Sequence, residues 1–284
     1  MINLPFSFLI STSRGIFSYK DSVIDKIYNG GVCFGLCKLI DQYVVLNRNN
    51  YDGTGGGNPN GVNSLEFFDT SLKYLGGIGL EFIKDGHQLY ADENNDLYIT
   101  NTGLNIITRI SQDGKILNFL PNPESGSDVH HYNSINKDKD RWLITQHRSK
   151  SGQDDGGVTI FDKDWNKINY KVVGKHVHNC VVHDGFLWVT KSYDGELVRN
   201  NFDSPMPGTS TYSIAPGYLT RGLIFKDSYL LVGLSEFDTR DNRHGAKTGR
   251  IKVFKYPEIE YLDTIEIPDC GQINDLLLIE NYEK

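Results

Sequence analysis

The sequence predicts an all-β fold built from a repeated unit, and two observations lead to this expectation. Across the 284 residues, short β-rich segments are bounded by Gly, Asn and Asp, and runs with a helical period are hard to find. In addition, one pattern recurs along the chain: a polar residue, a short apolar strand, a turn, and a second apolar strand that ends near Thr or Ser. A recurring unit of this kind is a strong guide to architecture.

The stretch 175–190 shows the unit most clearly, as a strand, a two-residue turn at Asp184-Gly185 and a second strand. We align six copies through a residue at the start of each first strand, namely Phe34, His87, His131, His178, Arg221 and Asp275. The second strands that follow cover 43–47, 97–101, 142–146, 186–190 and 229–235. A repeat of about 40–50 residues with four strands per copy is typical of a β-propeller.

The two ends of the chain complete each other in this alignment. The sixth copy has a first strand at 273–279 and no strand after it. The N-terminus supplies three strands, 6–11, 15–19 and 23–28, without an innermost one. Joining the two ends closes the ring and removes an open sheet edge. We therefore predict one six-bladed β-propeller domain over residues 1–284, closed by N-terminal strands that pair with the C-terminal strand; five or seven blades are the alternatives.

Composition narrows the class of protein. The formal net charge is -7 without a basic stripe, which argues against nucleic acid and anionic membranes as partners. No stretch approaches the roughly 18 apolar residues of a membrane span. The four cysteines form no Cys-x-x-Cys pair, so reduced thiols in a cytoplasmic protein are expected. Residues 1–10 are apolar without a basic start, which favours a strand over a signal peptide.

Three long connections each follow a second strand, at 49–61, 149–157 and 237–248. Their matched positions place them on one face of the ring, where they would form a mouth over a site. Mobile surface loops are the alternative. The glycine-rich loop 49–61 lacks a following Lys-Ser or Lys-Thr, so it is not a phosphate-binding P-loop.

Three histidines carry the site hypothesis. Because first strands line the channel of a propeller, His87, His131 and His178 are expected to converge near its axis. Three imidazoles can hold a divalent metal (Zn, Mn, Fe or Ca) and leave a position open for water or substrate. His130 and His176 are alternates if the register is shifted. A metal-free site for a polar ligand and simple solvated channel histidines are the competing interpretations.

Other polar residues complete the candidate site. Arg221 would hold a carboxylate, phosphate or sulfate through its planar fork, and Asn133 and Asn179 would contact the substrate. Asp275 would orient a histidine or act as a base beside the catalytic His87, His131 and His178. Arg221 and Asp275 as a structural ion pair is the alternative. We expect His147, His183 and His244 at the surface, Cys180 as a buried thiol, and Trp142 and Trp188 in the core.

The segment 216–223, followed by 231–235, resembles the most distinctive part of a family of conserved bacterial proteins of unknown function. Further parallels are His131-Tyr132-Asn133, His178-Asn179 with Leu187-Trp188, His87 with 99–102, and Asn274-Asp275-Leu276. The likeness covers about residues 80–280, and Gln88 and Asn179-Cys180 depart from the family pattern. The resemblance implies a propeller and carries no activity.

These observations predict an enzyme that acts on a small polar, anionic, sugar-like substrate at the propeller axis. Elimination, epimerisation and hydrolysis are the candidate reactions, with or without a divalent metal. The alternative from another class is a non-catalytic module that binds a glycan or a peptide, and a pure protein scaffold is the third. The small-molecule partner follows from the polar residues that the repeat gathers at one end of the channel.

Overall fold

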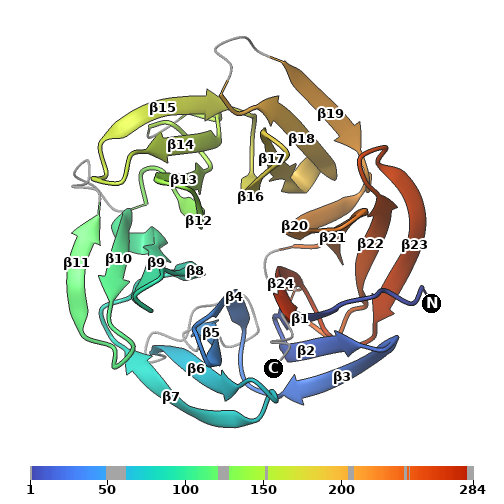
Figure 1. The fold of residues 1–284 in the computed structure, drawn as a ribbon, viewed down its shortest axis with the longest axis horizontal. Coiled ribbons are helices and arrows are strands. Elements are labelled where there is room, and N and C mark those ends of the chain that lie inside the picture. The colour runs from blue at the N-terminus through green and yellow to red at the C-terminus, as the bar shows by residue number, and fades with distance from the viewer. Residues whose placement is uncertain are drawn as a thin grey trace.

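Six four-stranded antiparallel sheets stand in a ring around a central channel in the computed structural model (Figure 1). The structure describes residues 2–48, 62–120, 128–150, 153–203, 208–239, 242 and 244–279. The six-bladed propeller predicted from the repeat is therefore confirmed. Among these residues the only helical segments are two short 3-10 turns, η1 (Thr102–Leu104) and η2 (Ser192–Asp194).

Each blade contributes one strand to each of four concentric layers. The innermost strands are β4 (Cys33–Lys38), β8 (Gly86–Ala91), β12 (Tyr132–Asp138), β16 (Val177–His183), β20 (Tyr218–Lys226) and β24 (Ile273–Ile279). The second strands are β5 (Gln42–Arg48), β9 (Leu97–Asn101), β13 (Arg141–Gln146), β17 (Phe186–Lys191), β21 (Tyr229–Glu236) and β1 (Ser7–Thr12). The third strands are β6 (Asn63–Asp69), β10 (Ile106–Ile110), β14 (Gly157–Phe161), β18 (Glu196–Asn201), β22 (Gly249–Lys255) and β2 (Gly15–Lys20). The outermost strands are β7 (Tyr74–Leu80), β11 (Ile116–Leu120), β15 (Lys167–Val172), β19 (Thr209–Ser213), β23 (Glu260–Ile267) and β3 (Val23–Tyr28).

The ring closes where strands from the two ends of the chain share one sheet. β24 pairs antiparallel with β1, with Ser7 opposite Ile279 and Ser11 opposite Asp275. This sheet has the order β24-β1-β2-β3, so the last strand is the innermost one of the blade that the N-terminus begins. The predicted closure is confirmed, and it gives the inner strand the hydrogen-bonding partner that it would lack otherwise.

A bulge at the same level in every blade sets the geometry of the channel. The register between the first and second strands shifts there in all six sheets. A bulge adds a residue to one strand and re-aims its side chains. Nine inner-strand residues line a narrow constriction on the axis, and one from each blade forms a ring there: Phe34, His87, Asn133, His178, Arg221 and Asn274.

This ring corrects the sequence alignment in two blades. Asn133 takes the place assigned to His131, and Asn274 takes the place assigned to Asp275. His131 lies two residues before Asn133, in the turn that precedes β12. His176 likewise lies two residues before His178, in the turn that precedes β16. Both histidines have a positive φ, 54° and 53°, and so does Asp85 (59°), which holds the same position before β8. These three residues therefore form a second ring, nearer to the mouth of the channel.

Apolar side chains between neighbouring blades hold the ring together. One buried cluster joins Leu46 and Leu65 of one blade to Leu89, Leu97 and Ile99 of the next. Full burial of each such side chain contributes about 1.5–3 kcal/mol. Trp142 and Trp188 are both buried, as predicted; the ring of Trp142 lies 4.5 Å from that of Tyr98 and 4.8 Å from that of Trp165. A packed scaffold of this kind keeps the residues at the axis in fixed positions.

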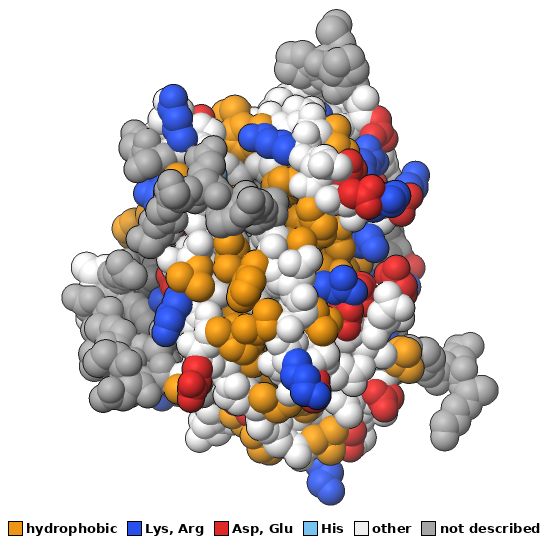
Figure 2. All heavy atoms as spheres, turned by 90° about the vertical axis from the view of Figure 1, so that its left-hand side faces the viewer, with side chains coloured by type: hydrophobic (Ala, Val, Ile, Leu, Met, Phe, Trp, Pro, Cys, Tyr) orange, Lys and Arg blue, Asp and Glu red, His pale blue; other side chains and the backbone are white. Residues whose placement is uncertain are grey.

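The outer rim exposes several large hydrophobic side chains. Ile116, Leu117 and Phe119 of β11 are exposed, and Figure 2, which looks onto that side of the ring, shows hydrophobic side chains gathered there. The described part of the chain contains no helix with the length and apolar character that a membrane span requires.

Candidate functional site

A polar cavity of about 320 Å³ opens at the end of the channel where the inner strands begin. We call it the polar mouth. It is lined by five histidines, three arginines, three aspartates and three apolar or aromatic residues: His87, His131, His147, His176, His178, Arg48, Arg148, Arg221, Asp85, Asp128, Asp238, Tyr193, Leu219 and Phe237. The structure thus brings His87, His131, His178 and Arg221 into one cavity.

The imidazoles form a continuous series across the polar mouth. The ring centroid of His131 lies 5.4 Å from that of His87 and 4.4 Å from that of His147. The ring of His147 in turn lies 5.0 Å from that of His178 and 5.5 Å from that of His176. The histidines that the sequence placed near the axis are therefore neighbours, although they come from two levels of the channel.

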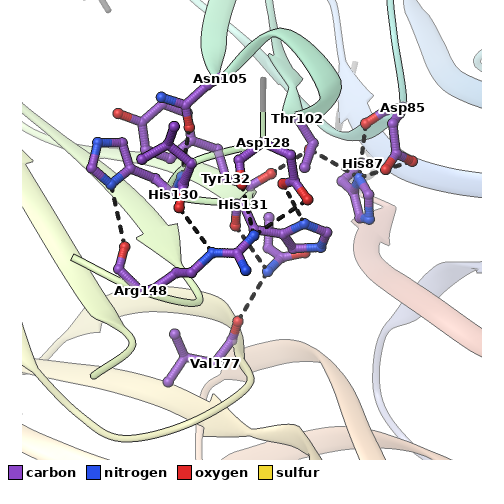
Figure 3. A network of polar contacts seen from close by, with 12 residues as sticks. Asp85, His87, Thr102, Asn105, Asp128, His130, His131, Tyr132, Arg148 and Val177 are labelled. Carbon is purple, nitrogen blue, oxygen red and sulfur yellow. Dashed lines mark hydrogen bonds and ion pairs between the residues drawn. The ribbon is translucent and has the colours of Figure 1, made fainter. Parts of the chain in front are cut away.

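His87 is held through its Nδ1 atom, as Figure 3 shows. This nitrogen lies 2.9 Å from the carbonyl oxygen of Asp85 and 3.0 Å from Oγ1 of Thr102, which donates to the carbonyl of Tyr132. Because a carbonyl oxygen only accepts, Nδ1 carries the proton and Nε2 keeps a lone pair. Burial, and then the nearby Arg48 guanidinium, hold the pKa of His87 well below its ordinary value. His87 is therefore neutral.

His178 is held in the same way two blades further on. Its Nδ1 lies 2.7 Å from Oγ of Ser192, and Ser192 donates to the carbonyl of Thr220. The Nε2 atom accepts a hydrogen bond of 2.7 Å from Nη2 of Arg221. Burial and the Arg221 charge keep the pKa of His178 well below its ordinary value. Thr102 and Ser192 begin the 3-10 turns η1 and η2, so a small hydroxyl residue after a second strand fixes a histidine of the first strand.

His131 is oriented by a carboxylate. Its Nδ1 lies 2.7 Å from Oδ1 of Asp128, which leaves Nε2 as the nitrogen without a protein partner among the described residues. The guanidinium of Arg148 donates to the carbonyl oxygens of Val129 (2.8 Å) and Asp128 (2.7 Å) and thereby fixes the turn that carries Asp128 (Figure 3). The alternate His130 does not line the polar mouth; its ring stacks on Tyr132 with centroids 5.4 Å apart. The other alternate, His176, does line it.

His147 is the site residue that the sequence interpretation missed. We expected His147 and His244 at the surface, yet the ring of His147 is enclosed in the polar mouth and His244 is buried. The Nε2 atom of His147 is inaccessible to solvent and has no hydrogen-bond partner in the described part of the chain. Burial, followed by the neighbouring His131, lowers its pKa, so the imidazole is neutral.

A signal for His147 is present in the repeat. The partners Cys33–Asn47, Gly86–Asn101, Tyr132–Gln146 and Val177–Lys191 mark the same register position in four blades. The residue after each of these second-strand partners is Arg48, Thr102, His147 and Ser192, in that order. Two of them line the polar mouth, and the other two hold its histidines. Aligning the ends of the second strands would have assigned His147 to the site.

The arginines of the polar mouth differ in how they are held. Arg221 donates through Nη1 to Oδ1 of Asn274 at 3.1 Å. When the side-chain amide of Gln272 is turned so that its oxygen faces Arg221, that oxygen also accepts a hydrogen bond from Nε of Arg221 at 3.2 Å. Arg48 pairs with Asp85, and its Cζ lies 5.4 Å from the ring centroid of Phe34. Three guanidinium groups are thus fixed around one cavity that also contains neutral histidines.

The histidines of the polar mouth are not arranged as a set of metal ligands. No group of three or more His, Cys, Asp or Glu side chains among the described residues has an arrangement that could hold a metal ion. In the predicted set of His87, His131 and His178, the Nε2 lone pair of His178 already accepts from Arg221. A metal would require that hydrogen bond to break. The three histidines therefore do not fit a metal centre in this arrangement.

The remaining predicted residues lie at or below the constriction. Asn133 lines the constriction and donates to the carbonyl of Val177 at 3.3 Å. Asn179 and Asp275 line a second cavity on the far side. Oδ1 of Asp275 accepts from Nδ2 of Asn179 at 3.1 Å, and Oδ2 accepts from Nε2 of Gln88 at 3.1 Å and from the Leu36 amide at 3.2 Å. We call Asp275, Asn179, Gln88 and the Leu36 amide the axial belt, and the constriction lies between this belt and the polar mouth.

Of the three long connections predicted from the sequence, the third contributes described residues to the polar mouth. Phe237 and Asp238, from the third predicted loop, line the polar mouth. Residues 49–61 of the first loop, and 151–152, 240–241 and 243 of the other two, lie outside the described residues.

No protein-family model and no curated protein matches the chain. Solved structures with a similar fold include the nidogen/laminin complex (TM-score 0.68, 10% identity, 96% of this chain and 98% of that chain). They also include a protein of unknown function from Bacteroides caccae (TM-score 0.68, 10% identity, 98% and 100%). A candidate 6-phosphogluconolactonase from Bacteroides fragilis is a third (TM-score 0.61, 13% identity, 97% and 98%). At these identities the likeness shows the propeller fold alone, and the specific family motifs stay a prediction.

Proposed function

We propose that the polar mouth binds a small, sugar-like carboxylate or phosphate and that a neutral histidine removes a proton from it. The observation that carries the proposal is the enclosed, unpartnered Nε2 of His147 within a cavity that three arginines share. A buried polar atom without a partner costs free energy, which a ligand that donates a hydrogen bond recovers. A hydroxyl group of a bound sugar acid is such a donor.

The arginines that line the polar mouth favour a ligand with a negative charge. Guanidinium groups bind carboxylates and phosphates through paired, charge-assisted hydrogen bonds. Arg148 and Arg221 come from different blades and are held by neutral carbonyl, amide or imidazole groups as well as by Asp128. A cavity of about 320 Å³ suits a single sugar-sized molecule.

The histidines suit proton abstraction better than acid catalysis. His87, His147 and His178 have lowered pKa values, so they are uncharged and can accept a proton. A bound anion stabilises an adjacent imidazolium and therefore raises the pKa of the base only when substrate is present. In the proposed step, the C–H bond beside a carboxylate breaks and the proton passes to Nε2 of His147 or His87. The electron pair spreads onto the carboxylate that the arginines hold, a step shared by elimination and epimerisation.

The test combines binding with isotope exchange. Wild-type protein is titrated calorimetrically with glucuronate, gluconate and glucose 6-phosphate, and the two carboxylate mixtures are followed by NMR in D₂O for loss of the C–H signal beside the carboxylate. His147→Gln is expected to weaken anion binding about tenfold or more and to abolish exchange. His183→Gln is the matched control, because His183 stacks on Phe225 outside the polar mouth. Equal binding by the two variants would contradict the proposal, and binding without exchange would favour the non-catalytic binding module.

A further inference from the structure

The channel has a second cavity, of about 390 Å³, at the end opposite the polar mouth. We call it the apolar mouth. Apolar side chains from all six inner strands line it, among them Leu36, Leu89, Ile135, Val181, Leu223 and Leu276. The axial belt lies between the two cavities, and Gln88 and Asn179 border both the constriction and the apolar mouth.

One carboxylate faces this apolar space. Asp275 is buried and lines the apolar mouth but not the polar mouth. Its hydrogen-bond donors, the backbone amides of Leu36 and Leu276 and the side-chain amides of Gln88 and Asn179, are all neutral. These donors satisfy the hydrogen-bonding capacity of the Asp275 carboxylate but supply no positive charge. Within the described residues Asp275 forms no ion pair, and a buried charge without a counter-ion is costly.

We propose that the apolar mouth binds a small primary amine with an apolar body, whose ammonium group pairs with the Asp275 carboxylate. The ammonium supplies the missing positive charge, while the apolar body contacts the leucine, isoleucine and valine side chains of the wall. An anion would be repelled by Asp275. An alcohol of the same shape could donate a hydrogen bond but would leave the charge uncompensated.

The other polar groups of the apolar mouth do not replace this cation. Lys38 also lines it, but the donors to Asp275 among the described residues are neutral amides. Cys37, Tyr90 and Cys180 are the remaining titratable groups of the wall, and burial raises the pKa of each, so they are neutral. Burial likewise raises the pKa of Asp275, to about 6. Amine affinity should therefore increase as the pH rises from 5 to 7, because Asp275 becomes ionised over that range.

The test compares three ligands of one shape on the full chain: phenethylamine, 2-phenylethanol and phenylacetate, each titrated calorimetrically at pH 7. Phenethylamine is expected to bind at least about tenfold more tightly than the other two, and Asp275→Asn is expected to lose that preference. Equal affinity for the amine and the alcohol, or an unchanged preference in Asp275→Asn, would overturn the proposal.

A second variant covers the case in which Asp275→Asn fails to fold. Ala91→Trp fills the wall of the apolar mouth and leaves Asp275 in place. It is expected to lose phenethylamine binding, whereas His147→Gln, in the polar mouth, is expected to keep it. Retention of amine binding in Ala91→Trp, or its loss in His147→Gln, would place the amine elsewhere and overturn the assignment.

Discussion

The two mouths of the channel are built from the same six inner strands, yet their chemistry is opposite. At the bulge the strands present His87, His178 and Arg221, and beyond it they present Leu89, Val181 and Leu223. A shift of only two or three residues along each strand separates the two sets. The comparison shows that the repeat fixes the scaffold, whereas the position of a residue relative to the bulge decides which chemistry it joins.

The largest expected effect concerns the belt that keeps the two mouths apart. Asp275→Ala leaves the Leu36 amide, Gln88 and Asn179 without their acceptor. Since an unsatisfied buried donor costs about 1–3 kcal/mol, the free energy of unfolding should fall by about 3 kcal/mol or more. Urea denaturation at pH 4 measures this change, because the Asp275 carboxyl then carries its proton and the cost of its buried charge does not offset the loss. Gln88→Ala removes one of these donors and should cost less; an Asp275→Ala protein as stable as wild type would show that the belt does not hold the ring together.

The second prediction concerns the ionisation of Asp275. Its pKa in the folded protein is about 6 against an ordinary 3.8, so the folded state keeps the proton to higher pH than the unfolded state. The stability contributed by the protonated form is thus complete below about pH 4 and is lost as the pH rises to about 6. The loss corresponds to about 3 kcal/mol. Urea curves at pH 4, 5, 6 and 7 should show it in wild type relative to Asp275→Asn; parallel pH profiles would rule it out.

A smaller effect is expected in the polar mouth. Arg221→Gln removes the donor to Nε2 of His178 and the positive charge beside it. Burial remains, so the pKa of His178 should rise only part of the way toward its ordinary value, and anion affinity should fall about tenfold. An NMR titration of the His178 ring and calorimetry measure the two effects. Arg141→Gln, which changes an arginine over Phe202 outside both mouths, should alter neither.

The last prediction concerns the rate at which the cysteine thiols react. All four cysteines are free and buried, and burial raises the pKa of Cys180 in the apolar mouth to about 12. Because the thiolate is the reactive form, iodoacetamide at pH 8 should label the folded protein slowly and the urea-unfolded protein fully. Mass spectrometry counts the labelled sites. Rapid labelling of Cys37 or Cys180 in the folded state would mean that the apolar mouth is more open than the structure shows.

The architecture was predictable because each repeat carries its own strand-turn-strand pattern, and the unmatched strands at 6–28 and 273–279 could only complete each other. The bulge was not predictable from one sequence. In the segment His130-His131-Tyr132-Asn133, pattern alone does not show whether a histidine or the asparagine faces the constriction. A displacement of one residue likewise decides that Asn274, not Asp275, contacts Arg221. His147 was missed because the alignment followed first strands, whereas this histidine ends a second strand.

The strand that completes the ring also supplies Asn274 and Asp275, which are synthesised after every residue of the polar mouth. A nascent chain without β24 has an open seam where the floor of both cavities should be. Ligand recognition at either end therefore reports that the ring has closed, and a chain released before β24 would carry nearly every recognition residue and recognise nothing.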